Sequence, residues 1–596
     1  MDKYNIENTI SDLIINRAKV NPNNPAIIAP DREIITYQDL MAHMQEVSVF
    51  LQSLGVFKND AVAIVMQNGP EMASAFLCIS ASAISAPLNP NYTFEEFDFY
   101  YSDLDVKAVF LRRGDESPAE RVAEYRGIPT IYYEVDKKPT LSFTKNEVDP
   151  LKISVNPSYA GPEDTALLLH TSGTTSRPKI VPLEHRNLIA SAKNIMETLR
   201  LTNLDTCLNV MPLYHIHGLM GVLLSSIMAG AAVVTTPGFH TEKFFEWLHE
   251  YNATWYSAVP TMHQQILLQV NKFPEKIIGN KLRLIRSSSA SMPPNVMNGL
   301  ESNFNVPVIE AYGMTEASHQ MTCNPMPPKP RKSGSVGLPT GQEVSIMAED
   351  GSILGSNEIG EIVIRGPNVT RGYLNNPEAN ATAFSHGWFH TGDLGYHDEE
   401  GYFYISGRSK EIINRGGEKI FPREVDEVFL THPDVTQAVT FAVKHPTLGE
   451  DVVTAIILEN DSNTDENDLR EYVFERIADF KVPSQVIIVD EIPKGPTGKL
   501  QRIGLEEKLG NLISVGFLEP RDDVEKKLVE IYESILERET VGVLDNFFMI
   551  GGDSLSAIQV VTEIHAVFGI EINPYVIFRF PTIDKIAEYL RRLLAG

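Results

Sequence analysis

The sequence predicts an α/β protein of several domains: a large N-terminal region of mixed sheets covered by helices, a small α+β region, and a C-terminal bundle of about four helices. Three observations predict it. The chain has 596 residues, more than one hydrophobic core usually serves. Residues 1 to about 405 alternate short apolar strands with helical stretches. The last 80 or so residues repeat apolar positions at helical spacing only.

The expected boundaries follow changes in this pattern. We predict a large subdomain at 1–408, a small mobile subdomain at 409–510, a linker at 511–522 and a helical domain at 523–596. In the large subdomain the expected strands include 61–66, 107–111, 207–213, 232–236 and 283–290. In the small subdomain they include 436–443, 452–458 and 485–490, with a helix beginning near 465.

Three apolar stripes predict helices in the last domain. They are Val524, Leu528, Ile531 and Ile535, then Leu555, Ile558, Val561 and Ile564, and finally Ile583, Ile586 and Leu590.

Composition excludes some classes of partner. A net charge of -27 argues against nucleic acid and against an anionic membrane surface, because both are bound by clustered Lys and Arg. Residues 218–236 approach membrane-spanning length, but a small-residue break divides them into a short helix and a strand. Three distant cysteines and an N-terminus without an apolar signal core favour a cytoplasmic protein.

The stretch 171-TSGTTSRPK-179 follows an apolar strand and has the chemistry of a phosphate site. Small residues let the backbone approach an oxyanion, hydroxyls add donors, and Lys179 adds a charge. The Gly-Lys-Ser/Thr ending of a Walker loop is missing. A solvated turn is the alternative interpretation. The candidate phosphate-binding residues are Thr171, Ser172, Gly173, Thr174, Thr175 and Lys179.

Four further motifs occur in a fixed order: 311-AYGMTEAS-318, 391-TGDLGY-396, 406-SGRSKEIINRGGEKI-420 and 493-PKGPTGKLQR-502. With the loop at 171–179 they resemble the signatures of the adenylate-forming superfamily, which includes acyl-CoA synthetases, luciferase and the adenylation domains of nonribosomal peptide synthetases. The resemblance covers about residues 8 to 508. Among its branches the sequence looks most like the oxalyl-CoA synthetase group of acyl-CoA synthetases.

The resemblance implies a role for each motif. Tyr312, beside Gly313, would stack on adenine, and Thr315 would contact the α-phosphate. Glu316 would hold Mg²⁺, which prefers carboxylate and phosphate oxygens. Asp393, assisted by Arg408, would accept hydrogen bonds from the ribose hydroxyls.

In the small subdomain, the resemblance makes Lys499 the lysine that bridges the substrate carboxylate and the α-phosphate. A cation there offsets the repulsion between two anions in the transition state. Lys410 occupies the family's hinge position, where the small subdomain rotates between two poses. Gly416 and Gly417 would line the thiol tunnel after rotation, since glycine permits close approach and unusual φ values.

The stretch 545-DNFFMIGGDSLSAIQVV-561 resembles the phosphopantetheine attachment site of peptidyl carrier proteins, with Ser554 as the modified residue. A helix N-terminus suits a phosphodiester, because its free N–H groups and dipole favour negative charge. The alternative is that Asp553 or Ser554 merely caps the helix.

The acid remains unnamed at this point. Amino-acid-activating relatives carry an Asp after the strand near 210, and 209-NVMPLYHIHG-218 contains no acid. We therefore expect a substrate without an α-amine. His215 would lie at the substrate or thiol entrance, whereas His217 either joins it or only packs beside Gly218. The polar pocket candidates Ser289, Ser291 and His319 favour a short or polar acid over a fatty chain.

The sequence thus predicts an acid–thiol ligase that uses ATP and Mg²⁺ and carries 4′-phosphopantetheine on Ser554. It would form an acyl-adenylate, release pyrophosphate and load its own carrier, as a loading module for nonribosomal peptide or polyketide-type biosynthesis. Expected partners are a small carboxylic acid, a phosphopantetheinyl transferase and downstream carrier-dependent synthases. Two alternatives stay open: a ligase that releases acyl-CoA, and a non-catalytic nucleotide-binding scaffold that presents the carrier.

Overall fold

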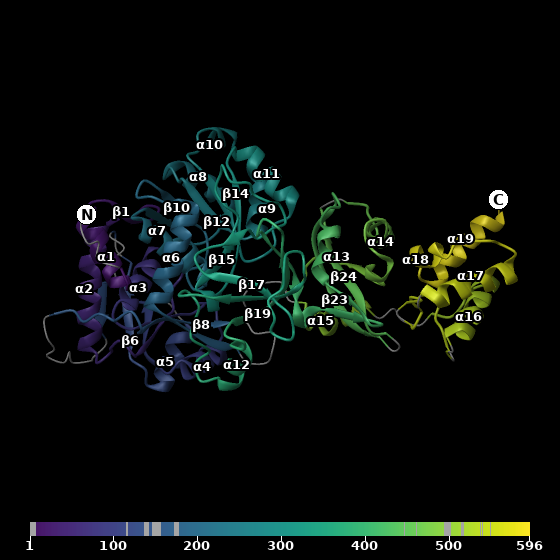
Figure 1. Ribbon diagram of the computed structural model, residues 1–596, viewed down its shortest axis with the longest axis horizontal. Helices are drawn as coiled ribbons and strands as arrows, with labels where there is room; N and C mark the ends of the chain where they lie inside the picture. The colour runs from purple at the N-terminus through teal and green to yellow at the C-terminus, as the bar shows by residue number, and fades with distance from the viewer. Residues whose placement is uncertain are drawn as a thin grey trace. The chain divides into compact units, whose positions relative to one another are not determined.

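The computed structural model describes residues 7–114, 117–135, 137, 142–145, 156–171, 178–445, 448–459, 462–493, 502–513, 518–536, 538, 540–548, 550–552 and 554–595. The chain divides into two compact units. The first comprises residues 1–391 and 395–405, and the second comprises 392–394 and 406–596. Figure 1 labels the helices and strands of both.

The first unit contains a seven-stranded sheet that is mostly parallel. Its order is β7 (Ser142–Lys145), β6 (Thr130–Glu134), β5 (Val106–Arg112), β3 (Ala61–Ile64), β4 (Ile84–Pro87), β8 (Thr165–Thr171) and β9 (Lys179–Glu184). Strands β8 and β9 form an antiparallel hairpin that pairs Thr171 with Lys179. The hairpin therefore brings both ends of the predicted phosphate loop together.

The same unit also contains a nine-stranded sheet. Its order is β16 (Leu338–Pro339), β15 (His319–Cys323), β14 (Val308–Met314), β13 (Leu284–Ser287), β12 (Trp255–Ala258), β10 (Thr206–Asn209), β11 (Ala232–Thr235), β1 (Pro25–Ile28) and β2 (Ile35–Thr36). The run from β14 through β13, β12 and β10 is parallel. Their carboxyl ends consequently meet at one edge of the sheet.

Helices cover the faces of these sheets and bury their apolar side chains against them. They are α1 (Ile10–Val20), α2 (Tyr37–Ser53), α3 (Pro70–Ser80), α4 (Phe94–Asp103), α5 (Pro118–Arg126), α6 (His185–Leu199), α7 (Ser225–Ala229), α8 (Thr241–Glu250), α9 (Pro260–Gln269), α10 (Pro274–Ile278), α11 (Pro294–Phe304) and α12 (Pro377–Ala383). Every residue of α3 is buried. Threonine caps begin α1, α2 and α4 by accepting backbone N–H groups, as helix starts require.

The apolar stretch at 218–236 forms the π-helix η1 (His217–Leu224), helix α7 and strand β11, as its break predicts. Gly230, in the left-handed conformation, ends α7. None of the helices formed by the described residues is long and apolar enough to cross a membrane.

A four-stranded sheet follows in the chain, in the order β17 (Glu343–Met347), β18 (Gly360–Arg365), β19 (Phe389–His397) and β20 (Phe403–Arg408). The next sheet has β22 (Glu418–Ile420), β21 (Ile413–Arg415), β24 (Gly449–Leu458) and β23 (Val435–His445), with β25 (Gln485–Ile488) on β24. Its helices are α13 (Pro422–Phe429), α14 (Glu466–Phe474) and α15 (Leu505–Ile513). These strands and helices confirm the predicted α+β pattern.

Helix α15 continues to Ile513, three residues into the stretch that we expect to be a linker at 511–522. Leu509 is buried and Ile513 packs beside the same apolar cluster, which contains Val439 and Ile487 of the small subdomain. Burial of this apolar face extends the helix into residues whose composition resembles a linker.

Among the described residues of the C-terminal bundle there are four helices, as predicted: α16 (Asp523–Leu536), α17 (Ser554–Phe568), α18 (Tyr575–Arg579) and α19 (Ile583–Ala595). Leu528, Ile586 and Leu590 are fully buried in its core. The predicted stripe on α17 is wrong in part, because Leu555 and Ile558 are 69% and 51% exposed. Ala557, Val560 and Ile564 form the buried face instead.

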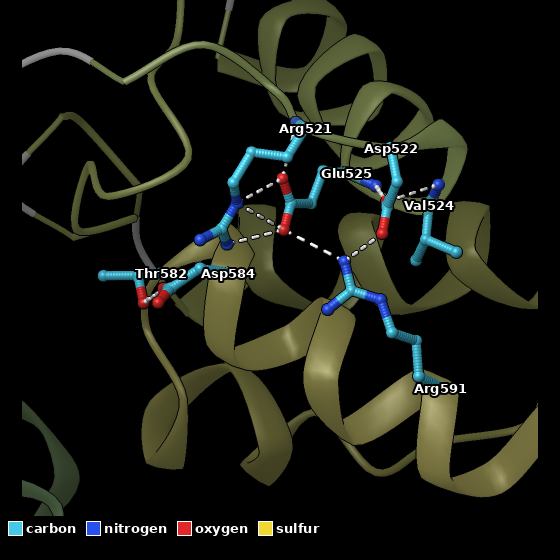
Figure 2. Close-up of polar contacts among 7 residues, drawn as sticks. All are labelled: Arg521, Asp522, Val524, Glu525, Thr582, Asp584 and Arg591. Atoms are coloured by element: carbon cyan, nitrogen blue, oxygen red, sulfur yellow. Dashed lines mark hydrogen bonds and ion pairs between the residues drawn. The ribbon is translucent and has the colours of Figure 1, made fainter.

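A carboxylate joins two helices of this bundle. Figure 2 shows Glu525 of α16 between Arg521 and Arg591, the latter on α19. The Glu525 side chain is fully buried, and its Oε1 accepts from Arg521 Nη2 at 2.6 Å and from Arg591 Nη2 at 3.0 Å. Arg591 also pairs with Asp522. The hydrogen bonds from Arg521 are the main cause that lowers the pKa of Glu525 to about 2.

Candidate active site

The predicted acid-binding residues follow the parallel strands of the nine-stranded sheet. His215 and His217 follow β10, while Ser289 and Ser291 follow β13. Tyr312 and Gly313 lie at the end of β14, and β15 begins at His319. The carboxyl edge of a parallel sheet is where open α/β proteins bind ligands. The fold therefore brings these sequence-distant residues to one edge.

The two histidines after β10 occupy different environments. His215 is half-buried, and its ring lies 4.7 Å from that of Tyr214. His217 begins the π-helix η1 and is 2% exposed. Its Nδ1 lies 3.0 Å from Ser289 Oγ, and its Nε2 lies 2.7 Å from Ser257 Oγ. His217 thus belongs to a polar network and does more than pack beside Gly218.

Arg286 is the centre of that network. Its Nη1 donates to Ser257 Oγ at 3.1 Å, and its Nη2 donates to His319 Nε2 at 3.0 Å and to Gln320 Oε1 at 2.9 Å. The residue is fully buried on β13, and burial lowers the pKa of its guanidinium. Arginine nevertheless stays charged at neutral pH.

Close packing holds the histidines of this network. The His217 and His319 rings are stacked, with centroids 5.0 Å apart. A Cβ at Gly221 of η1 would lie 2.6 Å from His319 Nε2, and one at Gly313 would lie 1.6 Å from the His319 carbonyl oxygen. Both positions therefore require glycine.

The backbone at this edge is also unusual. Ser289 and His319 have φ values of 76° and 96°, which non-glycine residues rarely adopt. Ser289 is half-buried, whereas Ser291 is exposed. Of the three predicted pocket residues, Ser289 and His319 therefore belong to one network, and Ser291 is exposed.

Two of the motifs expected to bind nucleotide meet at a second cluster in the same unit. Glu316 lies in the short helix η3 (Thr315–Ala317) and is 5% exposed. Its Oε1 accepts the Tyr373 hydroxyl hydrogen at 2.9 Å. Lys179 Nζ lies 4.4 Å from the centre of the Tyr373 ring. Tyr373 thus connects the lysine of the phosphate loop with the predicted Mg²⁺ ligand. Residues 172–177, including Ser172, Gly173, Thr174 and Thr175, lie outside the described residues.

The donor set near Glu316 fits a magnesium ion that is shared with phosphate. Within the part of the chain that the structure describes, no three His, Cys, Asp or Glu side chains gather to hold a metal. Mg²⁺ commonly takes one or two protein carboxylates and completes its shell with water and substrate phosphates. A single buried carboxylate matches that requirement.

The second unit contains the predicted ribose and hinge residues. Arg408 Nε donates to Asp393 Oδ1 at 3.0 Å, and the Asp393 carboxylate is 7% exposed. Lys410 lies in the short helix η4 (Ser409–Glu411) and is exposed. Gly416 and Gly417 join β21 to β22 as a two-residue turn, and their φ values are 61° and 96°. Such a turn requires positive φ at both positions, which glycine supplies.

The remaining predicted residues are only partly described. Lys499 lies outside the described residues. Ser554 is the first residue of α17, which is the placement predicted for a phosphopantetheine site. Before it, Gly551 has a φ of 111°, and a Cβ at Gly552 would lie 2.4 Å from the Phe547 ring. The two glycines therefore let the chain enter the helix closely against the bundle core.

Sequence reasoning missed four residues: Ser257, Arg286, Gln320 and Tyr373. One signal could have revealed Arg286. It is a charged residue in the middle of the strand expected at 283-RLIRSSSA-290, directly after Leu284 and Ile285. Lone buried charges are rare unless they are paired or functional. Nothing in the sequence near 373 indicates the contact of Tyr373 with Glu316.

Comparisons with known families match three parts of the chain. Residues 15–374 match the family model described as AMP-binding enzyme, and residues 424–499 match the model of its C-terminal domain. Residues 526–590 match the model described as phosphopantetheine attachment site. These matches follow the order of the motifs in the sequence.

Individual proteins give the same result. Oxalate–CoA ligase of Arabidopsis thaliana is 46% identical over 501 residues, which cover 83% of this chain and 97% of that protein. Oxalate–CoA ligase of Saccharomyces cerevisiae is 41% identical, over 80% of this chain and 94% of its own. The o-succinylbenzoate CoA synthetase of Bacillus subtilis, solved with ATP and magnesium, superposes with a TM-score of 0.71 at 30% identity. That superposition covers 83% of this chain and 99% of the synthetase.

Proposed function

We propose, because the chain belongs to the AMP-binding enzyme family, that it activates a small dicarboxylic acid and loads it onto its own carrier domain. The protein is an acid–thiol ligase of the adenylate-forming type, it depends on ATP, and it carries a phosphopantetheine attachment domain. The proposal adds the substrate, the acceptor and the residues.

One observation carries the choice of acid. The edge of the sheet where Ser289 and His319 lie is polar and is connected to the buried guanidinium of Arg286. A long apolar chain would offer these groups neither a further acceptor nor a counter-charge, which is unfavourable in a buried site. An acid with two carboxylates supplies acceptors and negative charge. The relatives at 46% and 41% identity are oxalate–CoA ligases, which supports an acid of oxalate's size.

The first half-reaction joins two anions. An oxygen of the substrate carboxylate attacks the α-phosphorus of ATP, a new O–P bond forms, and the bond to pyrophosphate breaks. Lys179 lies at the loop that would hold the departing phosphates, and Glu316 would hold the Mg²⁺ that neutralises them. Thr315 would contact the α-phosphate, Tyr312 would lie on adenine, and Asp393 with Arg408 would hold the ribose. Lys499 would stand between the two reactants.

The second half-reaction exchanges one acyl bond for another. The phosphopantetheine arm supplies a thiol, whose sulfur attacks the acyl carbon, and the C–O bond to AMP breaks. His215 would lie where the thiol enters. Lys410 would be the hinge between the two half-reactions, and the turn at Gly416–Gly417 would approach the arm. The loaded chain would serve carrier-dependent synthases after a phosphopantetheinyl transferase has modified Ser554.

ATP–pyrophosphate exchange with a panel of carboxylic acids tests the substrate. We expect exchange with oxalate to exceed exchange with monocarboxylates and fatty acids of any length. Preference for a long-chain acid would overturn the assignment. The acceptor is tested separately, by adding CoA to the wild-type chain and to Ser554→Ala. We expect the variant to keep exchange and to lose acylated protein.

A second candidate, an enzyme that releases acyl-CoA, is favoured by the CoA ligases among its relatives. It predicts acyl-CoA formation at equal rates in wild type and Ser554→Ala.

A further inference from the structure

Arg286 is a buried cation whose partners are all neutral. The side chain contacts Ser257, His319 and Gln320, and Nη1 lies 3.4 Å from His217 Nε2. Its Nε is buried and has no hydrogen-bond partner. Among the described residues no carboxylate forms an ion pair with it. An uncompensated buried charge is destabilising, so its presence indicates a ligand that supplies the counter-charge.

We propose that Arg286 is a positioning and specificity-determining residue that selects an acid with a second carboxylate, acting through His217 and His319. This inference rests on the proposed function and deepens it.

The direction of the hydrogen bonds follows from Arg286. A guanidinium nitrogen can only donate, so His319 Nε2 accepts and the imidazole carries its hydrogen on Nδ1. Arg286 Nη1 also lies 3.4 Å from His217 Nε2, so that nitrogen is an acceptor, and Ser257 Oγ, 2.7 Å from it, donates to it while accepting from Arg286. His217 then carries its hydrogen on Nδ1 and donates to Ser289 Oγ, 3.0 Å away. Ser289 keeps its own hydrogen for another acceptor.

The network therefore runs outward from the core. It begins at a fully buried guanidinium and ends at Ser289, which is half-buried beside the exposed Ala290. Each bond is polarised by the charge at its inner end, and such chains strengthen one another in a low-dielectric interior. The second branch passes to His319, whose ring stacks on His217. Both branches thus make the hydrogen-bond donors at the same edge of the sheet more positive.

The strained positions fit this role. Ser289 and His319, the outer members of the two branches, both have positive φ values. Gly221 leaves room for the His319 ring, because a Cβ there would lie 2.6 Å from its Nε2. Strain of this kind persists where the surrounding structure fixes a functional geometry.

A second carboxylate would place an additional negative charge at this edge. A monocarboxylate of similar size offers no such charge, and it gains nothing from the buried cation. The network should therefore raise the activity toward a dicarboxylate relative to a monocarboxylate. It should affect the activity toward the monocarboxylate itself much less.

ATP–pyrophosphate exchange on the full chain tests the inference, with oxalate compared to glyoxylate, which has an aldehyde in place of one carboxylate. We expect Arg286→Met to lower the ratio of kcat/KM for oxalate over glyoxylate by about 10-fold or more. Arg286→Lys keeps the positive charge but loses the paired hydrogen bonds of the two branches. It should therefore keep most of the oxalate-over-glyoxylate ratio, while kcat/KM falls for both acids.

A merely structural arginine predicts a different pattern. Arg286→Met would then lower both values of kcat/KM equally, and that result overturns the inference while the proposed function stands. If wild type itself does not prefer oxalate, the proposed function and the inference both fail.

Two serine variants test the inference even if the Arg286 variants do not fold. Ser289→Ala removes the outer end of one branch and should also lower the oxalate ratio. Its neighbour Ser288 donates to the Ala311 carbonyl at 2.9 Å and lies outside the network, so Ser288→Ala should leave the ratio unchanged. Equal ratios in the two alanine variants would contradict the assignment.

Discussion

The Tyr373 hydroxyl donates to Glu316 Oε1 at 2.9 Å. The two residues are 57 positions apart in the chain, and Lys179 Nζ lies 4.4 Å from the centre of the same tyrosine ring. Tyr373 thus orients the carboxylate on one side and contacts the lysine of the phosphate loop on the other. We therefore propose that Tyr373 positions the two side chains expected to bind the nucleotide.

Tyr373→Phe should lower kcat/KM for ATP in the exchange reaction by about 10-fold, since a hydrogen bond to a charged group is worth about 1.5 kcal/mol or more. It should also raise the Mg²⁺ concentration needed for half-maximal rate. Tyr402→Phe is a matched control, because Tyr402 also lies under a lysine and donates to a backbone carbonyl. A normal Mg²⁺ requirement in Tyr373→Phe would argue against the role.

Gly313→Ala should disrupt the hairpin of β14 and β15. The new Cβ would lie 1.6 Å from the His319 carbonyl oxygen, so the strands must separate. We expect a loss of roughly 1–3 kcal/mol in the free energy of unfolding, the usual cost of overpacking, and a loss of exchange activity. Thermal unfolding measures the first effect. Gly510→Ala, with no atom within 4 Å of its Cβ and a helical position, should be neutral or stabilising.

The carrier bundle should lose stability in acid through Glu525. Hydrogen bonds from Arg521 lower the pKa of Glu525 to about 2, below its ordinary value of 4.5. A carboxyl group with a lowered pKa stabilises the fold above its ordinary pKa, and the contribution disappears as the pH falls from about 4.5 to about 2. Glu525→Gln should therefore destabilise the bundle at pH 7, with a difference from wild type that shrinks toward pH 2.

Hydrogen exchange of peptides from residues 523–595, measured in the full chain and corrected for intrinsic rates, tests this dependence. Glu530→Gln, an exposed position on the same helix, should behave like wild type. A constant difference between Glu525→Gln and wild type at all pH values would contradict the role of the charge.

Lys499→Ala should suppress adenylation by several orders of magnitude, because in the proposed mechanism this lysine supplies the cation where two anions react. Thioester formation from a preformed acyl-adenylate should be largely spared. The two half-reactions can be measured separately, by pyrophosphate exchange and by transfer from synthetic adenylate. Equal losses in both would contradict the assigned role.

Sequence patterns predicted the secondary structure where periodicity and burial agree. The strand at 107–111 is a short apolar run, the stripe Ile583, Ile586 and Leu590 has helical spacing, and both elements are present as β5 and α19. The pattern failed on α17, because Leu555 and Ile558 share the helical spacing but face away from the core. Spacing fixes the type of element, whereas the neighbouring helices decide which face is buried.

The candidate site was predictable only as far as its motifs. Glu316 and Asp393 belong to short segments whose chemistry is visible in the sequence. The Arg286 network joins residues from η1, β12, β13 and β15, separated by 29 to 69 positions from Arg286. Strand order creates this contact, and no local pattern encodes it.

The mass of the intact phosphopantetheinylated chain, after incubation with ATP, Mg²⁺ and oxalate, tests the central claim most directly. The account predicts an ATP-dependent acyl addition that maps to Ser554 and is absent from Ser554→Ala. No acyl addition to the chain with oxalate or any other acid, together with acyl-CoA formation once CoA is supplied, would contradict it.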